Sequence, residues 1–114
     1  AALKYNQRLA NHPKLVTPFR KGDCDTHVYH QYTLKLIDGD RDGLVKYLNN
    51  KGIPCGIYYP IPLHLQKAYT SENYKPDDFK VTLEIVNQVV SLPMHTELDD
   101  NQINFITDTI ESFL

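Results

Sequence analysis

The stretch GIPCGIYYPIPLHLQ, residues 52–66, constrains the fold of this chain more than any other segment. Its side chains alternate as they do in a strand, where successive residues point to opposite faces. One face holds Ile53, Cys55, Ile57 and Tyr59. Tyr58 lies on the other face, and Pro60 and Pro62 have no N–H with which to pair. The pattern predicts a short strand over residues 53–59 that leaves its sheet as a stiff, extended loop.

The same stretch brings four candidate binding residues together in the sequence. Tyr58 and Tyr59 end the expected strand, and His64 and Gln66 follow in the loop. Aromatic and polar groups on a loop positioned by a rigid strand are a common way to form half of a binding site. The alternative is that both tyrosines are ordinary sheet and core residues, because most aromatic residues in strands simply pack.

The remaining periodicity predicts an α+β fold in which a small sheet is covered by three main helices, mainly on one face. The three helices are expected over residues 41–51, about 78–90 and from Asp99 to the end. Further elements are expected over residues 1–11 (helix), 28–37 (strand) and 62–69 (short helix). Asp40 and Asp99 are suited to cap helix N-termini, Asp99 with Gln102 as its capping-box partner, and Gly52 is suited to end a helix.

Composition excludes several classes of function. The 114 residues carry a net charge of −2 without a basic run, which gives no electrostatic footprint for nucleic acid or an anionic membrane. No segment reads as a membrane span or a signal peptide. Cys24 and Cys55 lack metal-type spacing, so we expect free thiols in a reducing cytoplasm.

The five histidines do not form a recognisable metal site. His27 and His30 are three residues apart at an expected strand start, which puts them on opposite faces, and His64 and His95 lie in separate loops. Cys55 is expected on a buried strand, where a thiol is usually inert, and no Gly-x-Ser-x-Gly or phosphate-binding glycine loop is present. A self-contained active site is therefore not expected.

Four patches of the chain carry a family resemblance. They are HVYHQYTLKL, the run DRDGL at residues 40–44, GIYYPIPLHLQKAY and SLPMH at residues 91–95. In this order they resemble the small C-terminal domain of the DegT–DnrJ–StrS family of sugar aminotransferases, which are pyridoxal-phosphate enzymes of the aspartate-aminotransferase fold. The resemblance implies that residues 1–12 are the tail of the helix joining two domains and that residues 13–114 are the small domain.

The resemblance also implies an activity for a longer parent protein. The chain begins at Ala1 inside an expected helix, so we expect a C-terminal fragment. The Schiff-base lysine and the pyridoxal phosphate would belong to a large N-terminal domain, and this chain alone should be inactive. The parent is expected to be a cytoplasmic homodimer that transfers an amino group from glutamate to a keto sugar nucleotide in surface-polysaccharide or deoxyaminosugar biosynthesis.

The resemblance implies roles for the candidate site residues. Tyr58 and Tyr59 match the paired aromatic position at the family's substrate, where phenols can donate hydrogen bonds to sugar or phosphate oxygens. His64 and Gln66 belong to the same motif and are further substrate-binding candidates, whereas His30 is interpreted as mostly structural. No catalytic, cofactor-binding or metal-binding residue is expected in this chain. Two alternatives stay open: a free-standing, non-catalytic α+β module that binds a small ligand or a protein, and a purely structural lobe.

Overall fold

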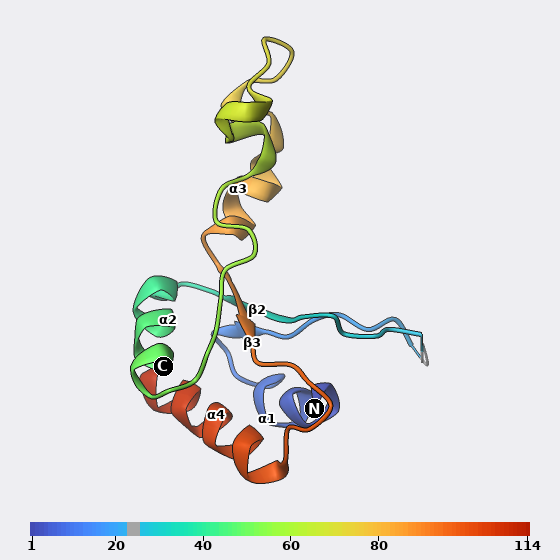
Figure 1. Ribbon diagram of the computed structural model, residues 1–114, viewed down its shortest axis with the longest axis vertical. Coiled ribbons are helices and arrows are strands. Elements are labelled where there is room, and N and C mark those ends of the chain that lie inside the picture. Colours follow the sequence, from blue (N-terminus) through green and yellow to red (C-terminus); the bar gives the residue numbers. More distant parts are fainter. Residues whose placement is uncertain (23–25) are drawn as a thin grey trace.

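The computed structural model describes residues 1–22 and 26–114 and confirms the α+β class (Figure 1). In chain order the regular elements are α1 (Ala2–Leu9), β1 (Leu15–Val16), β2 (Tyr32–Leu36), α2 (Arg41–Asn50), α3 (Lys80–Val86), β3 (Val89–Leu92) and α4 (Asp100–Phe113). Three 3₁₀ turns, Leu63–Leu65, Lys67–Tyr69 and Pro76–Phe79, precede α3. The expected free thiol of Cys24 falls outside the described residues.

The described strands form one antiparallel sheet in the order β1–β2–β3. Leu34 at the centre of β2 lies opposite Val90 of β3. Alternate residues of β2, Tyr32, Leu34 and Leu36, are buried, as the period-2 pattern predicts. The strand is shorter than expected, since it begins at Tyr32 and the side chain of Val28 is 87% exposed.

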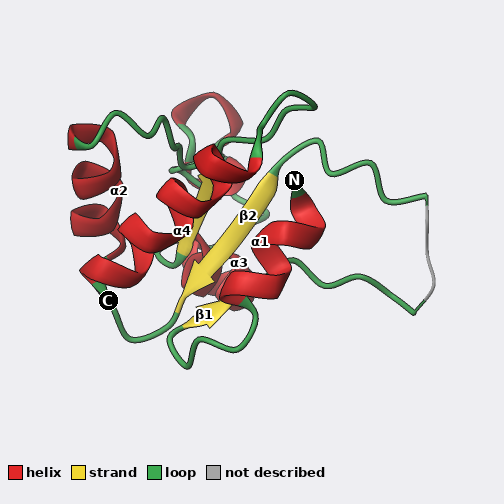
Figure 2. Cartoon of the chain, turned by 90° about the horizontal axis from the view of Figure 1, so that it is seen from below, coloured by secondary structure: helices red, strands yellow, loops and turns green. Residues whose placement is uncertain are grey.

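A single hydrophobic core joins α1, α2 and α4 to the sheet. Figure 2 shows α1 and α4 lying across the face of β2, with α2 beside them. The buried members are Ala2, Tyr5, Leu9, Leu15, Tyr32, Leu34, Leu36, Leu44, Leu48, Ile53, Val90, Leu92, Ile103, Ile106 and Ile110. Helical spacing accounts for the stripe that each helix contributes, because residues three and four apart share a face. The helix expected over residues 1–11 is present as α1, which ends at Leu9.

Helix ends follow the signals in the sequence. The Asp40 carboxylate accepts a 2.8 Å hydrogen bond from the Gly43 N–H at the start of α2. Gly52, just beyond this helix, has a φ of +76°, a conformation that glycine adopts without a side-chain clash. At α4, Asp99 accepts from the Gln102 N–H and the Gln102 side chain accepts from the Asp99 N–H, which forms the expected capping box.

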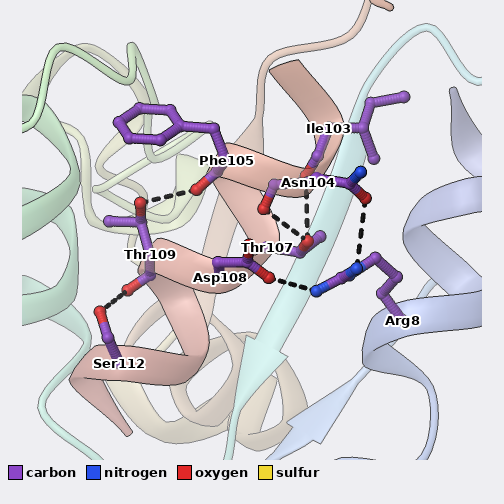
Figure 3. Close-up of polar contacts among 8 residues, drawn as sticks. All are labelled: Arg8, Ile103, Asn104, Phe105, Thr107, Asp108, Thr109 and Ser112. Atoms are coloured by element: carbon purple, nitrogen blue, oxygen red, sulfur yellow. Dashed lines mark hydrogen bonds and ion pairs between the residues drawn. The ribbon is translucent and has the colours of Figure 1, made fainter. Parts of the chain in front are cut away.

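Polar contacts on the surface link α1 to α4, although the two helices lie at opposite ends of the sequence (Figure 3). The Arg8 guanidinium donates to the Asn104 side chain at 3.2 Å and forms an ion pair with Asp108. One turn earlier, Lys4 pairs with Asp100. The charged groups of both ion pairs are substantially exposed, and water and salt screen exposed charges, so these pairs contribute little to the stability of the fold. Apolar burial provides the larger contribution.

Residues 57–88, called the arm below, project from the sheet and carry the 3₁₀ turns and α3 (Figure 1). Its large apolar residues with exposed side chains are Tyr58, Tyr59, Ile61, Leu63, Leu65, Tyr69, Tyr74, Phe79 and Val81. The helix expected over about residues 78–90 is wrong at its C-terminal end, because α3 stops at Val86 and Val89 and Val90 belong to β3. The apolar residues Leu83, Ile85 and Val86 of α3 are only partly buried. Pairing with β2 overrides the helical periodicity there.

The strand expected over residues 53–59 is also wrong. Only Gly56 forms a bridge, to Ser91, and the rest of this segment is irregular. Beyond this bridge the chain leaves the sheet and enters the arm, as predicted (Figure 1). Within the described residues, no helix is long and apolar enough to cross a membrane.

Candidate functional site

Gly56 attaches the candidate site to the sheet. Its N–H donates to the Ser91 carbonyl at 3.1 Å, and the Ser91 N–H donates back to the Gly56 carbonyl at 2.7 Å. Ser91 lies in the fully buried strand β3, and its hydroxyl is 2.8 Å from the Thr33 hydroxyl in β2. The backbone that leads into the two tyrosines is therefore held at one point by the rigid part of the molecule.

Tyr58 and Tyr59 stand at the base of the arm with accessible rings. Their side chains are 53% and 78% exposed, which contradicts the reading of both as core residues. The ring centroids are 6.4 Å apart and the planes meet at 73°, so the two rings present an edge and a face rather than a stack. The peptide bond between them is cis. Both phenols can contact a ligand.

A pocket of about 450 Å³ lies between these tyrosines and α3. Its lining residues are Tyr58, Tyr59, Ile61, Pro62, Leu63, Gln66, Thr82, Ile85, Val86 and Val89. The Gln66 amide nitrogen donates to the Ile61 carbonyl at 3.2 Å, and this bond holds the side chain beside the pocket. Three of the four candidate residues, Tyr58, Tyr59 and Gln66, therefore border one cavity. The wall is apolar with a few polar groups, as is typical of small-molecule sites.

A second pocket, of about 440 Å³, lies on the other side of Tyr58. It is lined by His30, Gln31, Pro54, Cys55, Gly56, Tyr58, Ser91, Leu92, Pro93, Met94 and His95. Sequence reasoning did not select Gln31 or His95 as site residues, and it interpreted His30 as mostly structural. The only signal for His95 was its place in the SLPMH patch. Tyr58 is the residue that borders both cavities.

His64 lies away from the other candidates. Its Nε2 is 3.1 Å from the Pro76 carbonyl, and its ring centroid is 4.7 Å from that of Phe79. It borders a separate cavity of about 410 Å³ with Leu63, Tyr69, Tyr74, Phe79 and Thr82. These contacts hold the two halves of the arm together. The structure therefore does not bring His64 to the pocket that Tyr58, Tyr59 and Gln66 share.

Among the described residues, no Asp, Glu, Lys or Arg side chain lines the two Tyr58 pockets. Burial raises the pKa of the Cys55 thiol, which keeps it protonated and a weak nucleophile. Among the residues that the structure describes, no lysine or arginine borders either Tyr58 pocket, and no group of three or more metal-ligating side chains is found. The lining residues can donate hydrogen bonds and pack against rings. They include no lysine amine to bind the aldehyde of a phosphorylated cofactor and no lysine or arginine to pair with its phosphate.

The model of one protein family, described as the DegT/DnrJ/EryC1/StrS aminotransferase family, matches residues 1–111. The chain belongs to this family. Because almost the whole chain matches, the resemblance carried by the four sequence patches is confirmed. The solved structures that this DegT-family chain resembles are matched through their C-terminal portion.

Individual relatives and solved structures are also similar to this chain. A pleiotropic regulatory protein of Geobacillus stearothermophilus is 36% identical over 99 residues, which cover 87% of this chain and 26% of that protein. UDP-N-acetyl-3-dehydro-alpha-D-glucosamine 3-aminotransferase of Acidithiobacillus ferrooxidans is 39% identical over 90 residues, 77% of this chain and 23% of that enzyme. A DegT DnrJ EryC1 StrS aminotransferase from Brucella abortus superposes with a TM-score of 0.86 at 32% identity, covering 98% of this chain and 29% of that one. The DegT-family chain thus spans less than a third of the length of these proteins.

Proposed function

We propose that this DegT-family chain is the C-terminal small domain of a pyridoxal-phosphate-dependent aminotransferase that moves an amino group from glutamate to a keto sugar nucleotide. In this proposal residues 1–12 are the end of the helix that joins a large domain to this one, and residues 13–114 form the domain itself. The parent enzyme is a cytoplasmic homodimer that serves surface-polysaccharide or deoxyaminosugar biosynthesis. The family and the names of its relatives support this reading.

The arrangement of Tyr58, Tyr59 and Gln66 around one pocket is the observation that carries the proposal. A sugar nucleotide presents hydroxyls, phosphates and flat rings, and it needs hydrogen-bond donors on an apolar wall to orient it. Two phenol hydroxyls and one amide provide donors, and their surroundings provide the wall. Ile61, Val86 and Val89 exclude water from the bound sugar on one side.

The cofactor would be held outside this chain. When bound, pyridoxal phosphate supplies the electron sink for amino-group transfer, and the protein supplies binding and orientation. Among the described residues at the two Tyr58 pockets there is no lysine to bind its aldehyde and no lysine or arginine to pair with its phosphate. The role proposed for this domain is to close the cleft over the substrate and to hold the sugar nucleotide in one orientation.

The test uses the full-length gene product, mixed first with pyridoxal phosphate and then with glutamate. We expect a cofactor absorbance band that changes when glutamate is added, followed by amination of a UDP-linked 3-keto sugar, the substrate class named for the Acidithiobacillus relative. The same assay on this chain alone should show neither signal. Product is identified by mass spectrometry, so a shifted band without an aminated sugar would contradict the assignment of the substrate.

A matched pair of variants tests the site itself. Tyr58→Ala removes a donor and a ring surface and should raise the KM for the sugar nucleotide about tenfold, the equivalent of roughly 1.4 kcal/mol. Tyr74→Ala removes an equally exposed tyrosine of the arm that borders neither Tyr58 pocket, and it should leave KM close to that of the wild type. Absence of any cofactor band in a full-length protein that still binds sugar nucleotides would favour the non-catalytic binding module instead.

A further inference from the structure

The ring of Tyr58 lies directly on the main chain of Gly56. A Cβ atom placed on Gly56 would be 2.6 Å from both the Cζ and the hydroxyl oxygen of Tyr58, and 3.0 Å from its Cε2. Carbon atoms in proteins pack at about 3.5–4.0 Å, so alanine at position 56 is incompatible with this position of the ring. The phenol reaches its place between the two pockets because residue 56 has no side chain.

The backbone at Gly56 does not itself require glycine. Its φ lies outside the range from +20° to +160° in which residues with a side chain are strained. Gly52, by contrast, has a φ of +76° and open space around it, so glycine is needed there for the conformation of the chain. At Gly56 the requirement comes from the neighbouring ring. Substitution of Gly56 by alanine should therefore displace Tyr58 while leaving the fold intact.

The surface beneath the ring is fixed in space. Two backbone hydrogen bonds join Gly56 to Ser91, and the Ser91 hydroxyl contacts the Thr33 hydroxyl of the central strand. Displacement of the Gly56 backbone would break these hydrogen bonds, whereas the exposed Tyr58 ring can rotate away without breaking them. Because Tyr58 borders the pocket of His30 and His95 as well as that of Tyr59 and Gln66, its rotation changes the opening of both.

We propose that Gly56 is a positioning residue that sets the place of the Tyr58 phenol between these two pockets and so determines how the site accepts a sugar nucleotide. This inference rests on the function proposed above, in which Tyr58 contacts the substrate. With alanine at position 56, the phenol hydroxyl moves away from its hydrogen-bond partner on the ligand. Gly56→Ala should then lower the affinity for the sugar nucleotide as much as removal of the Tyr58 ring does, although residue 56 does not touch the ligand.

A double-mutant cycle in the full-length protein tests this role, with UDP-N-acetylglucosamine as a non-reacting probe and calorimetry as the readout. We expect Gly56→Ala and Tyr58→Ala each to weaken binding about five- to tenfold. In the Tyr58→Ala background, Gly56→Ala should change the affinity by less than about twofold, because the two residues act through one contact. Unfolding temperatures close to that of the wild type exclude a general loss of structure.

A spectroscopic readout separates the position of the ring from the contact with the ligand. With 3-fluorotyrosine at position 58, the ¹⁹F resonance should shift in Gly56→Ala without any ligand present, and the resonance of fluorotyrosine at position 74 should not. An unchanged resonance at position 58, or equal losses of affinity from Gly56→Ala in both backgrounds, overturns the positioning role. An unchanged affinity in Tyr58→Ala instead overturns the contact of Tyr58 with the substrate, and with it the proposed site.

Discussion

The hydroxyl of Tyr5 donates a 2.9 Å hydrogen bond to the carbonyl of Pro93, a residue 88 positions later in the chain. Tyr5 is a fully buried residue of α1, and Pro93 borders the pocket of His30 and His95. The bond therefore attaches the first helix to the segment that leaves β3 beside the candidate site. Without this bond, the hydroxyl of the buried Tyr5 and the part-buried Pro93 carbonyl would both lose a partner.

Tyr5→Phe should lower the free energy of unfolding by about 1–2 kcal/mol, because it leaves the Pro93 carbonyl without its donor while preserving the packed ring. Urea unfolding followed by circular dichroism measures the change. Tyr47→Phe is the control, since the contact of the Tyr47 hydroxyl with the Ser112 hydroxyl is exposed and 3.2 Å long, and its loss should cost much less. Equal effects of the two substitutions would contradict a special role for the buried bond.

Stability should fall at alkaline pH because of the same tyrosine. Burial raises the pKa of Tyr5 from 10.0 to about 12, and burial together with the neighbouring Tyr29 and Tyr5 raises the pKa of Tyr32. A folded-state pKa above the unfolded value means that the stabilising contribution is fully present below pH 10 and is lost as the pH rises toward 12. Urea midpoints at intervals across this range measure the decline, which should be shallower in Tyr5→Phe. A decline of the same slope in that variant would assign the effect to other groups.

Asp99→Ala should cost about 1 kcal/mol of stability, because the Asp99 carboxylate accepts a 2.8 Å hydrogen bond from the Gln102 N–H at the start of α4. Among the described residues, no other side chain caps this end of the helix. Thermal unfolding gives the measurement. Glu111→Ala removes an exposed carboxylate near the other end of the helix and serves as the control for the change of charge. If both variants unfold at the same temperature, the capping box contributes nothing measurable.

Gln66 and His64 should differ in function although they are two residues apart. Gln66→Ala should weaken sugar-nucleotide binding by about three- to tenfold, because its amide borders the pocket of Tyr58 and Tyr59. His64→Ala should leave affinity nearly unchanged and instead speed hydrogen exchange in the arm, since the ring contacts the Pro76 carbonyl and Phe79. The reverse pattern would place His64 in the site and Gln66 in the scaffold.

Local signals in the sequence predicted the elements that depend on neighbouring residues. Interactions between groups a few positions apart account for the caps at Asp40 and Asp99, the helix end at Gly52 and the helix α1. Such interactions form wherever the local sequence permits, so periodicity and capping rules are sufficient to find them. The order of the four sequence patches likewise indicated the family, which the match over residues 1–111 confirms.

Contacts between distant segments decided the rest. Val89 and Val90 fit the stripe of a helix, yet their burial against β2 makes them a strand, and residues 53–59 retain only the Gly56–Ser91 bridge of an expected strand. The sequence alone determined the residue types of the site and the α+β class. Only the tertiary structure decided that Gln66 borders one pocket with the two tyrosines and that His64 borders another with Phe79, because these positions depend on packing partners that periodicity does not specify.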